Sequence, residues 1–587
     1  MLRSAKERLS GIGALGGTLL ALGISLIVFA VAVPNAAYSR ALVSGTKDLA
    51  WGPTLFRSLL ALHGVLLAVY ALWGRRAAAF ATADRDDAPE SRTTSGWTYL
   101  LLGGFSVIAL VLRVWNLNSD LWIDEVFTLL DFVRQPAGVI LTSFPSQNQH
   151  MFFSLLAHLS TEMFGENAWA IRLPSVIFGV GSIWAFFYLA RYLFGNREAL
   201  LGCALMTVSY HHIWYSQNAR GYMGLLLFTL LATWCWLEAI EKNTKIWWFG
   251  YVVSVVLGMW IHPTMAFVVA GHALVFLVFL ILPMSVGGRD ERLSPERKVG
   301  LTPFVAWALS VTVTLQLYAL ALPEFLTLGL HEESKPSEWT NPLWVVTESI
   351  LALKIGFGGI FAVILAAAFV GFGWLLLFRA DRRAALVMTL PAILAGGSMV
   401  LLGHNIWPRF FFFSMGFGLI IVIHGATQLP SAITAFIKPL DAYRGFATTL
   451  GACLALLMIA ASVITVPKNY KLPKQDFSGA RSFVESERSQ GDGIVAVSLA
   501  GVVYGRYFTP SWPVASTASE LETLEDSSDS EWLIYTLPIE IKAFKPDLWR
   551  VIERDYSVVK IFPGTLNGGE VFVCKKKAYT GRNYRAE

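Results

Sequence analysis

The sequence predicts an all-α membrane protein with many transmembrane helices, followed by a small soluble α/β domain. Hydrophobic residues make up 55% of the 587 residues and charged residues only 15%. Apolar runs recur at roughly the 20 residues that an α-helix needs to cross about 30 Å of hydrocarbon. After residue 466 these long runs stop, and short alternating runs take their place.

About thirteen apolar runs qualify as transmembrane spans. The first follows the basic segment Met1–Arg8 and resembles a signal peptide, but it is too long and has no convincing cleavage site, so we expect it to remain as a span. The expected spans are 12–34, 54–74, 97–116, 170–194, 198–215, 219–240, 246–262, 264–284, 301–322, 350–378, 384–403, 408–428 and 447–466.

Basic residues indicate the orientation of these spans, because cytoplasmic loops are enriched in Lys and Arg. They cluster on one side: Arg3, Lys6, Arg8, Arg75, Arg76, Arg191, Arg197, Lys242, Lys245, the run Arg289–Lys298, Arg379–Arg383, Lys438 and Arg444. We expect that side to be the cytoplasm. The N-terminus is then inside, and the outer side receives loops 117–169 and 323–349 and everything after 466.

Three regions follow from this pattern. Residues 1–96 form an N-terminal helix pair with a cytoplasmic linker at 77–96, residues 97–466 a transmembrane catalytic region, and residues 467–587 an extracytoplasmic α/β domain. In the last region we expect strands at 494–498, 532–537, 558–562 and 570–574, and helices at 476–490 and 545–555. The segment 516–531 is acidic and is expected to be a solvated surface segment.

Composition excludes several functions. The net charge of +5 comes mostly from the loops that orient helices, so nucleic-acid binding is not indicated. Three of the four cysteines lie in apolar runs and Cys574 stands alone, which provides neither a disulfide framework nor a CxxC metal site. The sequence contains neither a P-loop nor a GxGxxG motif in a Rossmann context, so no nucleotide site is predicted.

Candidate site residues gather in the expected outer loops. Asp124 and Glu125 lie in LWIDEVFT, just after a span, where adjacent carboxylates are costly unless they bind a cation, an acceptor group or each other's proton. Asp124 could act as a general base, or Asp124 or Asp120 could simply cap a helix. His150 begins an amphipathic segment that reaches about Gly165 and is typical of an interfacial helix; His150 could hold an anion or cap that helix.

Arg220 lies in YSQNARGY at 215–222, at the outer end of a span. Orientation statistics disfavour a cation there, which points to a fixed negative partner such as Asp124 or a ligand phosphate. The alternative is that Arg220 extends to the outer lipid headgroups. The preceding pair His211 and His212 is a weak metal signal, because consecutive helical residues point about 100° apart.

Together these motifs resemble the polyprenyl-phosphate-dependent glycosyltransferases of the GT-C superfamily. LWIDEVFT, a loop helix that opens with His150, IRLPS at 171–175, ARYLFG at 190–195 and YSQNARGY occur in the order and spacing of glycosyltransferase family 39, the protein mannosyltransferases and the lipid A aminoarabinose transferase. The resemblance covers about 97–430 and is specific as an ordered set. It leaves out the two N-terminal spans.

The resemblance implies a role for each matching residue. Asp124 corresponds to the catalytic base in the family's Asp-Glu pair, with Glu125 beside it. Asn218 replaces the family's Glu, which removes a carboxylate and leaves open whether a divalent metal, Mg or Mn, takes part through Asp124 and Glu125. Cations near the outer surface are expected to hold the donor phosphate, and other polar or aromatic residues to bind substrate. The expected phosphate ligands are Arg220, Arg409, His150 and Lys354, and the expected substrate ligands are Tyr215, Gln217, Asn218, Tyr222, His262 and Trp407.

The expected function is therefore transfer of a hexose or pentose from a polyprenyl phosphate to an acceptor on a lipid-linked glycan, polysaccharide or protein. We expect a multi-pass protein of the bacterial cytoplasmic membrane that works at its outer face and inverts the anomeric centre. Two alternatives remain open: an oligosaccharide ligase or polymerase that uses a pyrophosphate-linked donor, and a lipid-glycan transporter or flippase. A transporter would place more ionisable residues near the middle of the bilayer.

Overall fold

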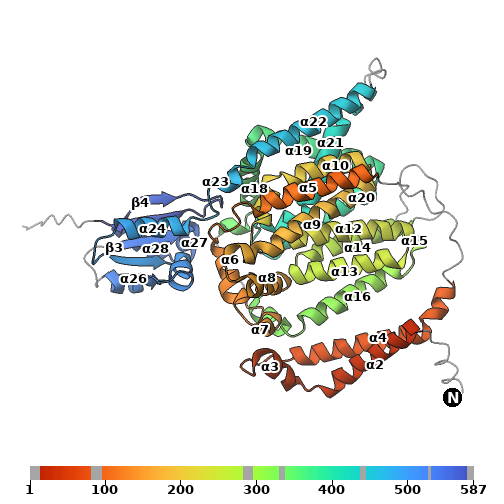
Figure 1. The fold of residues 1–587 in the computed structure, drawn as a ribbon, viewed down its shortest axis with the longest axis horizontal. Coiled ribbons are helices and arrows are strands. Elements are labelled where there is room, and N and C mark those ends of the chain that lie inside the picture. Colours follow the sequence, from red (N-terminus) through yellow and green to blue (C-terminus); the bar gives the residue numbers. More distant parts are fainter. Residues whose placement is uncertain are drawn as a thin grey trace, which may run out of the picture.

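The computed structural model describes residues 14–80, 95–281, 295–329, 337–436, 444–525 and 531–577. Long helices form a bundle, and a small sheet covered by helices lies beyond one end of it (Figure 1). The mostly helical fold with a C-terminal α/β region is the predicted fold class. Most of the expected linker 77–96, and the basic segment Met1–Arg8, lie outside the described residues.

The N-terminal helices form a pair beside the bundle (Figure 1). The pair is α2 (Ala14–Ala32) and α4 (Gly52–Phe80), and the short helix α3 (Asn35–Val43) lies between them in the chain. The pair α2 and α4 approaches closely at Gly23 and Gly64, since a Cβ built on Gly23 would lie 2.6 Å from the Gly64 carbonyl oxygen. Only glycine permits so close a contact between the two backbones.

The bundle and its connecting segments contain most of the chain. Its long helices are α5 (Gly96–Val114), α9 (Ala168–Phe194), α10 (Asn196–Thr207), α12 (Tyr222–Lys242), α13 (Lys245–Ile261), α14 (Met265–Ile281), α16 (Thr302–Tyr318), α18 (Pro342–Phe357), α19 (Ile360–Ala380), α20 (Arg382–Leu401), α21 (Met415–Phe436) and α22 (Arg444–Thr465). Short elements connect them: α6 (Ile123–Phe127), η1 (Thr128–Val133), α7 (Ala137–Thr142), α8 (Met151–Phe164), α11 (Tyr210–Ser216), α15 (Pro295–Lys298), α17 (Leu322–Glu324), η2 (Phe325–Gly329), η3 (Ser337–Thr340), η4 (Pro408–Ser414) and α23 (Lys468–Lys471).

Among the described residues, eight helices are long and apolar enough to cross a membrane, or ten if each of two bent helix pairs is one span. This describes a multi-pass membrane protein, but the expected number of thirteen spans is not confirmed. Many large apolar side chains on these helices are exposed, for example Leu100, Phe361 and Leu457, as expected where a helix faces lipid.

Two expected spans are interrupted. The run 198–215 is not one helix, because α10 ends at Thr207 and α11 begins at Tyr210; the buried Arg113 guanidinium donates to the Met206 and Thr207 carbonyls at this break. The run 350–378 is divided between α18 and α19, since Gly358 and Gly359 adopt φ values of 82° and 159°. Apolar composition alone does not reveal a break whose polar groups are paired inside the protein.

The C-terminal region is a five-stranded mixed sheet with the order β2-β1-β3-β5-β4. Its strands are β1 (Gly493–Val497), β2 (Val514–Ala515), β3 (Glu531–Thr536), β4 (Tyr556–Phe562) and β5 (Val571–Lys576). The pairs β1/β2 and β1/β3 are parallel, and β3/β5 and β4/β5 are antiparallel. The helical elements are α24 (Phe477–Glu487), α25 (Leu499–Val502), η6 (Val503–Tyr507), α26 (Ala518–Glu525), α27 (Pro538–Phe544) and α28 (Pro546–Asp555).

Burial explains this arrangement. Strands β1 and β3 are buried along almost their whole length, as expected for central strands covered on both faces. Helix α28 presents Leu548, Val551 and Ile552 to the sheet, at the helical spacing that places them on one side. The expected strands and helices of this region are all present, and the acidic segment 516–531 contains α26, although 526–530 lie outside the described residues.

Candidate active site

The short helix α6 carries Asp124 and Glu125 to the end of the bundle that faces the sheet (Figure 1). The chain enters α6 in an extended conformation at Trp122, and Glu125 Oε2 accepts a hydrogen bond from the Trp122 amide at 3.2 Å. A carboxylate at the third helical position stabilises the start of a helix when it accepts a hydrogen bond from the amide of the residue that precedes the helix. The helix then passes directly into the π-helical turn η1.

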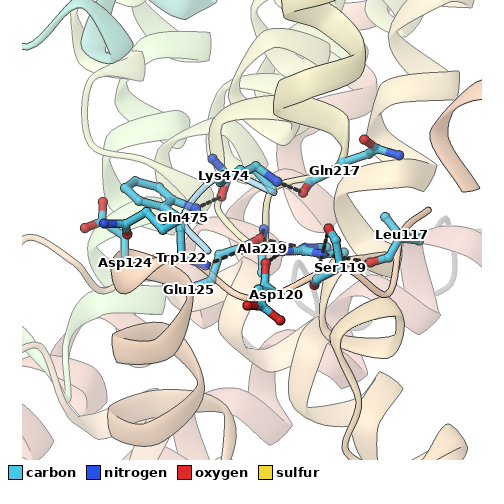
Figure 2. A network of polar contacts seen from close by, with 12 residues as sticks. Leu117, Ser119, Asp120, Trp122, Asp124, Glu125, Gln217, Ala219, Lys474 and Gln475 are labelled. Carbon is cyan, nitrogen blue, oxygen red and sulfur yellow. Dashed lines mark hydrogen bonds and ion pairs between the residues drawn. The ribbon is translucent and has the colours of Figure 1, made fainter. Parts of the chain in front are cut away.

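Glu125 is fully buried and all its hydrogen-bonding capacity is turned toward the protein (Figure 2). Oε1 accepts from Arg172 Nε at 2.9 Å and from the Ala219 amide at 2.6 Å, and Oε2 accepts from Arg172 Nη2 at 2.6 Å. These contacts connect α6 to α9 and to the turn that precedes α12. Glu125 is therefore placed to position the loop.

Arg172 has no exposed surface and fixes the loop before α6. Its guanidinium donates to the carbonyls of Leu117, Ser119 and Asp120, each at 2.8 Å, in addition to Glu125. Such a fully hydrogen-bonded buried pair is rigid, because a rearrangement would leave a charge without partners.

Charge keeps Glu125 ionised. Burial raises the pKa of its carboxyl, but the positive charges of Arg172 and Lys474 and the hydrogen bonds from Arg172 and Ala219 outweigh burial and lower that pKa. In turn, burial lowers the pKa of the Lys474 ammonium to about 7, against the opposing charge of Glu125.

Asp124 has different surroundings, although it is the next residue along the chain. Its Oδ2 lies 3.2 Å from Arg409 Nη1 and 3.9 Å from Arg220 Nη2, and among the described residues it accepts no hydrogen bond. The side chain is 17% exposed, and Figure 2 draws it at the edge of the Glu125 network. Asp124 is therefore a partly accessible carboxylate that lies between two guanidinium groups.

Arg220 is held from one side only. Its Nη1 donates to Thr128 Oγ1 at 3.4 Å and to the backbone oxygen of Asn148 at 3.2 Å, with a further contact to Asn148 Oδ1. Its Nε has no partner among the described residues. Arg220 is only 3% exposed, so it does not extend to the lipid headgroups.

His150 supplies a neutral donor next to these charges. Its Nδ1 accepts from the Gly221 amide at 2.8 Å, so the proton of the neutral ring is on Nε2, which is buried without a described partner. Burial, with the positive charges of Arg220 and Arg409 and the neighbouring imidazole of His262, holds the pKa of the His150 imidazole well below its usual range. The ring of His262 lies edge-on at 4.8 Å.

Aromatic side chains line a cavity of about 340 Å³ beside this cluster. The rings of Tyr215 and Phe412 are stacked with their centroids 3.8 Å apart. The guanidinium carbon of Arg409 lies 4.7 Å from the centroid of the Trp407 ring. The wall also includes the C-terminal residues 537–539 and 565–568. The volume and the aromatic lining are typical of sites for small molecules, which occupy roughly 300–1,000 Å³.

Unpaired polar atoms gather at and beside this cavity, whose lining includes Asn218, Tyr222 and Arg409 but not Asp124, His150 or Arg220. Within the described ranges, the buried atoms without a hydrogen-bond partner include Asp124 Oδ2, His150 Nε2, Asn218 Nδ2, Arg220 Nε, Tyr222 Oη and Arg409 Nε. Buried polar atoms in folded proteins are nearly always paired. Their concentration here indicates a site for a polar ligand with negative charge.

The structure brings most of the expected site residues together, but two lie apart. Gln217 donates to the Arg113 and Trp115 carbonyls at 3.0 and 2.7 Å, so its amide secures the end of α5. Lys354 is exposed on α18 and is absent from the cavity lining.

Other contributors were not identified from the sequence. The sequence contains one indication for Arg172, which lies inside an expected span, where a charge is rare unless it has a function or a partner. Asn148, Lys474 and Gln475 gave none, since polar loop residues are common. Trp339 and Trp344 also belong to the cavity wall.

The site suits a divalent metal poorly. Both oxygens of Glu125 are occupied by hydrogen bonds from the protein. The charged groups nearest to Asp124 are guanidinium groups, which cannot bind a metal ion as further carboxylates would. No group of three or more His, Cys, Asp or Glu in the described part of the chain could hold a metal ion. Hard divalent cations require several oxygen ligands, which this arrangement does not offer.

Comparison with known proteins agrees with the resemblance of the motifs. Residues 148–285 match the family model described as dolichyl-phosphate-mannose-protein mannosyltransferase. The chain is 30% identical over 89 residues to "Putative mannosyltransferase YkcB" of Bacillus subtilis (strain 168), which is 15% of this chain and 12% of that relative. The matched family segment includes His150, Arg220 and His262, whereas Asp124 and Arg409 lie outside it. The similarity to this type of membrane glycosyltransferase is thus confirmed for that segment.

Solved structures with a similar arrangement were also found. ArnT from Cupriavidus metallidurans bound to undecaprenyl phosphate is 13% identical with a TM-score of 0.45, over 83% of this chain and 99% of that one. The Archaeoglobus fulgidus oligosaccharyltransferase in its apo form is 12% identical with a TM-score of 0.48, over 84% of this chain and 76% of that one.

Proposed function

We propose that this protein is a membrane glycosyltransferase that moves a sugar from a polyprenyl phosphate to a hydroxyl acceptor. The observation that carries the proposal is the cluster in which Asp124, Arg220 and Arg409 meet beside an aromatic cavity that Arg409 lines, with buried polar atoms left without hydrogen bonds. The match of residues 148–285 to the family described as dolichyl-phosphate-mannose-protein mannosyltransferase supports the donor class.

Each member of the cluster has a role in this reaction. Asp124 takes the proton of the acceptor hydroxyl, while the acceptor oxygen forms a bond to the anomeric carbon and the bond from that carbon to the phosphate oxygen breaks. Arg220 and Arg409 stabilise the charge that develops on the departing lipid phosphate, and His150 Nε2 donates a hydrogen bond to it. One displacement inverts the anomeric centre.

The two arginines have to serve the carboxylate and the phosphate in turn. Without donor they neutralise Asp124. A donor phosphate carries the same kind of charge and attracts both guanidinium groups, which leaves Asp124 free to accept a proton. This exchange explains why a base is placed beside two cations.

The proposed location follows from the expected topology. The cluster lies on the outer face of a bacterial cytoplasmic membrane, with the N-terminus inside and the C-terminal domain outside. The donor's prenyl chain stays in the bilayer, and the acceptor is a glycan, lipid or protein that reaches the outer face.

The test is transfer by the purified protein. The wild-type protein and Asp124→Asn are incubated with a panel of polyprenyl-phosphate sugars and glycan acceptors, and released lipid phosphate is measured by mass spectrometry. We expect release from at least one donor with the wild type, reduced roughly 100-fold or more in the variant because the base is lost. Equal release by both proteins would contradict the role of Asp124, and no release from any donor would contradict the donor class.

A further inference from the structure

The segment 473–475 extends from the C-terminal region to two neighbouring parts of the site. These are the start of α6, which carries Asp124, and the turn that carries Arg220. Lys474 and Gln475 are 6% and 0% exposed. The loop after β4 holds the segment in place, because Thr565 and Leu566 amides donate to the Pro473 and Lys474 carbonyls at 2.9 and 3.1 Å. The backbones approach so closely that a Cβ on Gly564 would lie 2.1 Å from the Lys474 oxygen.

Gln475 connects the sheet to the start of α6. Its Oε1 accepts from the Ile123 amide at 2.9 Å, while its Nε2 donates to Thr536 Oγ1 at 3.0 Å and to the Gly569 carbonyl at 2.9 Å. The first amide of a helix has no partner within the helix. Gln475 therefore provides an acceptor that α6 itself lacks, one residue before Asp124.

Lys474 connects the same segment to the turn that carries Arg220. Its Nζ donates to the Gln217 carbonyl and lies 5.2 Å from the Trp214 ring. The Trp214 indole in turn donates to Thr565 Oγ1 at 2.9 Å. The segment thus contacts both chain segments whose side chains meet at the ion pair of Asp124 and Arg220.

The C-terminal region also contributes directly to the cavity. Residues 537–539 follow β3, and 565–568 belong to the loop that holds the segment 473–475. A shift of the sheet would therefore move a wall of the cavity together with α6.

We propose that Lys474 and Gln475 are positioning residues that set the relative placement of Asp124 and Arg220, so that the C-terminal sheet is a working part of the active site. This inference rests on the proposed glycosyl transfer. Its physical basis is that a misplacement of about 1 Å in a reacting group costs on the order of 100-fold in rate.

A first test does not depend on activity. Gln475→Met keeps the approximate side-chain volume but removes the acceptor for Ile123, whereas Gln475→Glu keeps an acceptor at that position. Amide hydrogen exchange of the peptide 117–133 is measured by mass spectrometry in full-length protein in detergent. We expect faster exchange with Gln475→Met and exchange closer to wild type with Gln475→Glu. Unchanged exchange with Gln475→Met would overturn the proposal.

A matched control separates this role from general stability. Tyr556→Phe removes the hydrogen bond from the Tyr556 hydroxyl to Glu531, 2.8 Å long and buried within the sheet. It should leave exchange of 117–133 as in the wild type. The same increase in the control would mean that any weakening of the sheet loosens α6, and would overturn the specific role of Gln475.

Kinetics then test the effect on transfer. Per folded molecule, Gln475→Met should lower kcat roughly tenfold or more through misplacement of the base, with a smaller change in the KM for the donor and with partial recovery in Gln475→Glu. Faster exchange with an unchanged kcat would overturn the positioning role. If the wild-type protein transfers no sugar, the exchange results still decide whether Gln475 holds α6, and only the proposed function fails.

Discussion

Two adjacent carboxylates on α6 lie in opposite surroundings. Glu125 faces the protein, has no exposed surface and has both oxygens hydrogen-bonded. Asp124 faces the guanidinium groups of Arg409 and Arg220, is 17% exposed and has an oxygen without a hydrogen bond among the described residues. Consecutive residues of a helix point about 100° apart, so one short helix can present one carboxylate to the scaffold and the next to a substrate.

The difference separates the structural part of the motif from its chemical part. A buried charge pair whose members are fully hydrogen-bonded is destabilised strongly when one member is removed. A group left incompletely paired in a cavity has capacity for a ligand. Mutations on the Glu125 side should thus alter folding, and those on the Asp124 side should alter transfer.

The largest effect on stability is expected from Arg172→Ala. The change leaves Glu125 charged and buried without its main partner, which costs about 3–5 kcal/mol. The thermal unfolding temperature in detergent should fall clearly. The control is Arg134→Ala, which breaks the ion pair with Glu166 whose members are 39% and 44% exposed, and which should cost at most about 1 kcal/mol. Equal losses in the two variants would contradict the structural role of the Glu125 network.

A smaller effect, on binding, is expected from the two arginines beside Asp124. Arg220→Lys keeps the charge but loses the planar fork, and a charge-assisted hydrogen bond contributes about 1.5–3 kcal/mol. The affinity for a polyprenyl phosphate should fall roughly tenfold or more, as measured by intrinsic tryptophan fluorescence. Arg409→Ala should weaken binding in the same way, because both cations hold one phosphate. Normal affinity in both variants would place the phosphate elsewhere.

Lys354→Ala is the matched control for these measurements. Lys354 is exposed on α18 and does not line the cavity, so its removal should leave donor affinity within about twofold of the wild type, as is usual for surface substitutions. A loss as large as that of Arg220→Lys would restore Lys354 to the phosphate site.

The smallest effect concerns pH. Burial lowers the pKa of Lys474 to about 7 in the folded protein, with Glu125 and Arg172 as the charges that face it, whereas an unfolded lysine has a pKa of about 10.4. Between these values the unfolded chain binds more protons, so Lys474 makes stability increase with pH from about 7 to 10. The unfolding temperature of Lys474→Met should rise less over this range than that of the wild type or of Lys471→Met, an exposed control. Equal pH slopes would contradict a lowered pKa.

The sequence was most informative where one local property decides the outcome. Helices such as α9, α12 and α22 were predicted because an uninterrupted apolar run in a membrane has few alternatives to a helix. Strands β1, β3, β4 and β5 were predicted from alternating runs bounded by turn residues. The two-residue strand β2 is too short to produce such a pattern, and the break at Ser209 depends on buried contacts of Arg113 that composition does not encode.

The site was partly predictable for a similar reason. Asp124 and Arg220 were identified because charges are rare at outer helix ends and need partners. Glu125 was expected to act with Asp124, but its environment is set by Arg172, which lies 47 residues away. Gln475 is 352 residues from Ile123, and no spacing rule relates two polar residues across that distance.

The most direct test measures stability and transfer together in Asp124→Asn and Glu125→Gln. Asp124→Asn should keep the unfolding temperature of the wild type within a few degrees and lose transfer roughly 100-fold or more. Glu125→Gln should lower the unfolding temperature, because an amide cannot accept all the hydrogen bonds that the carboxylate accepts, and should retain more transfer per folded molecule than Asp124→Asn. The opposite result, with transfer near wild type in Asp124→Asn and a stable but inactive Glu125→Gln, would contradict the division between a structural and a chemical carboxylate.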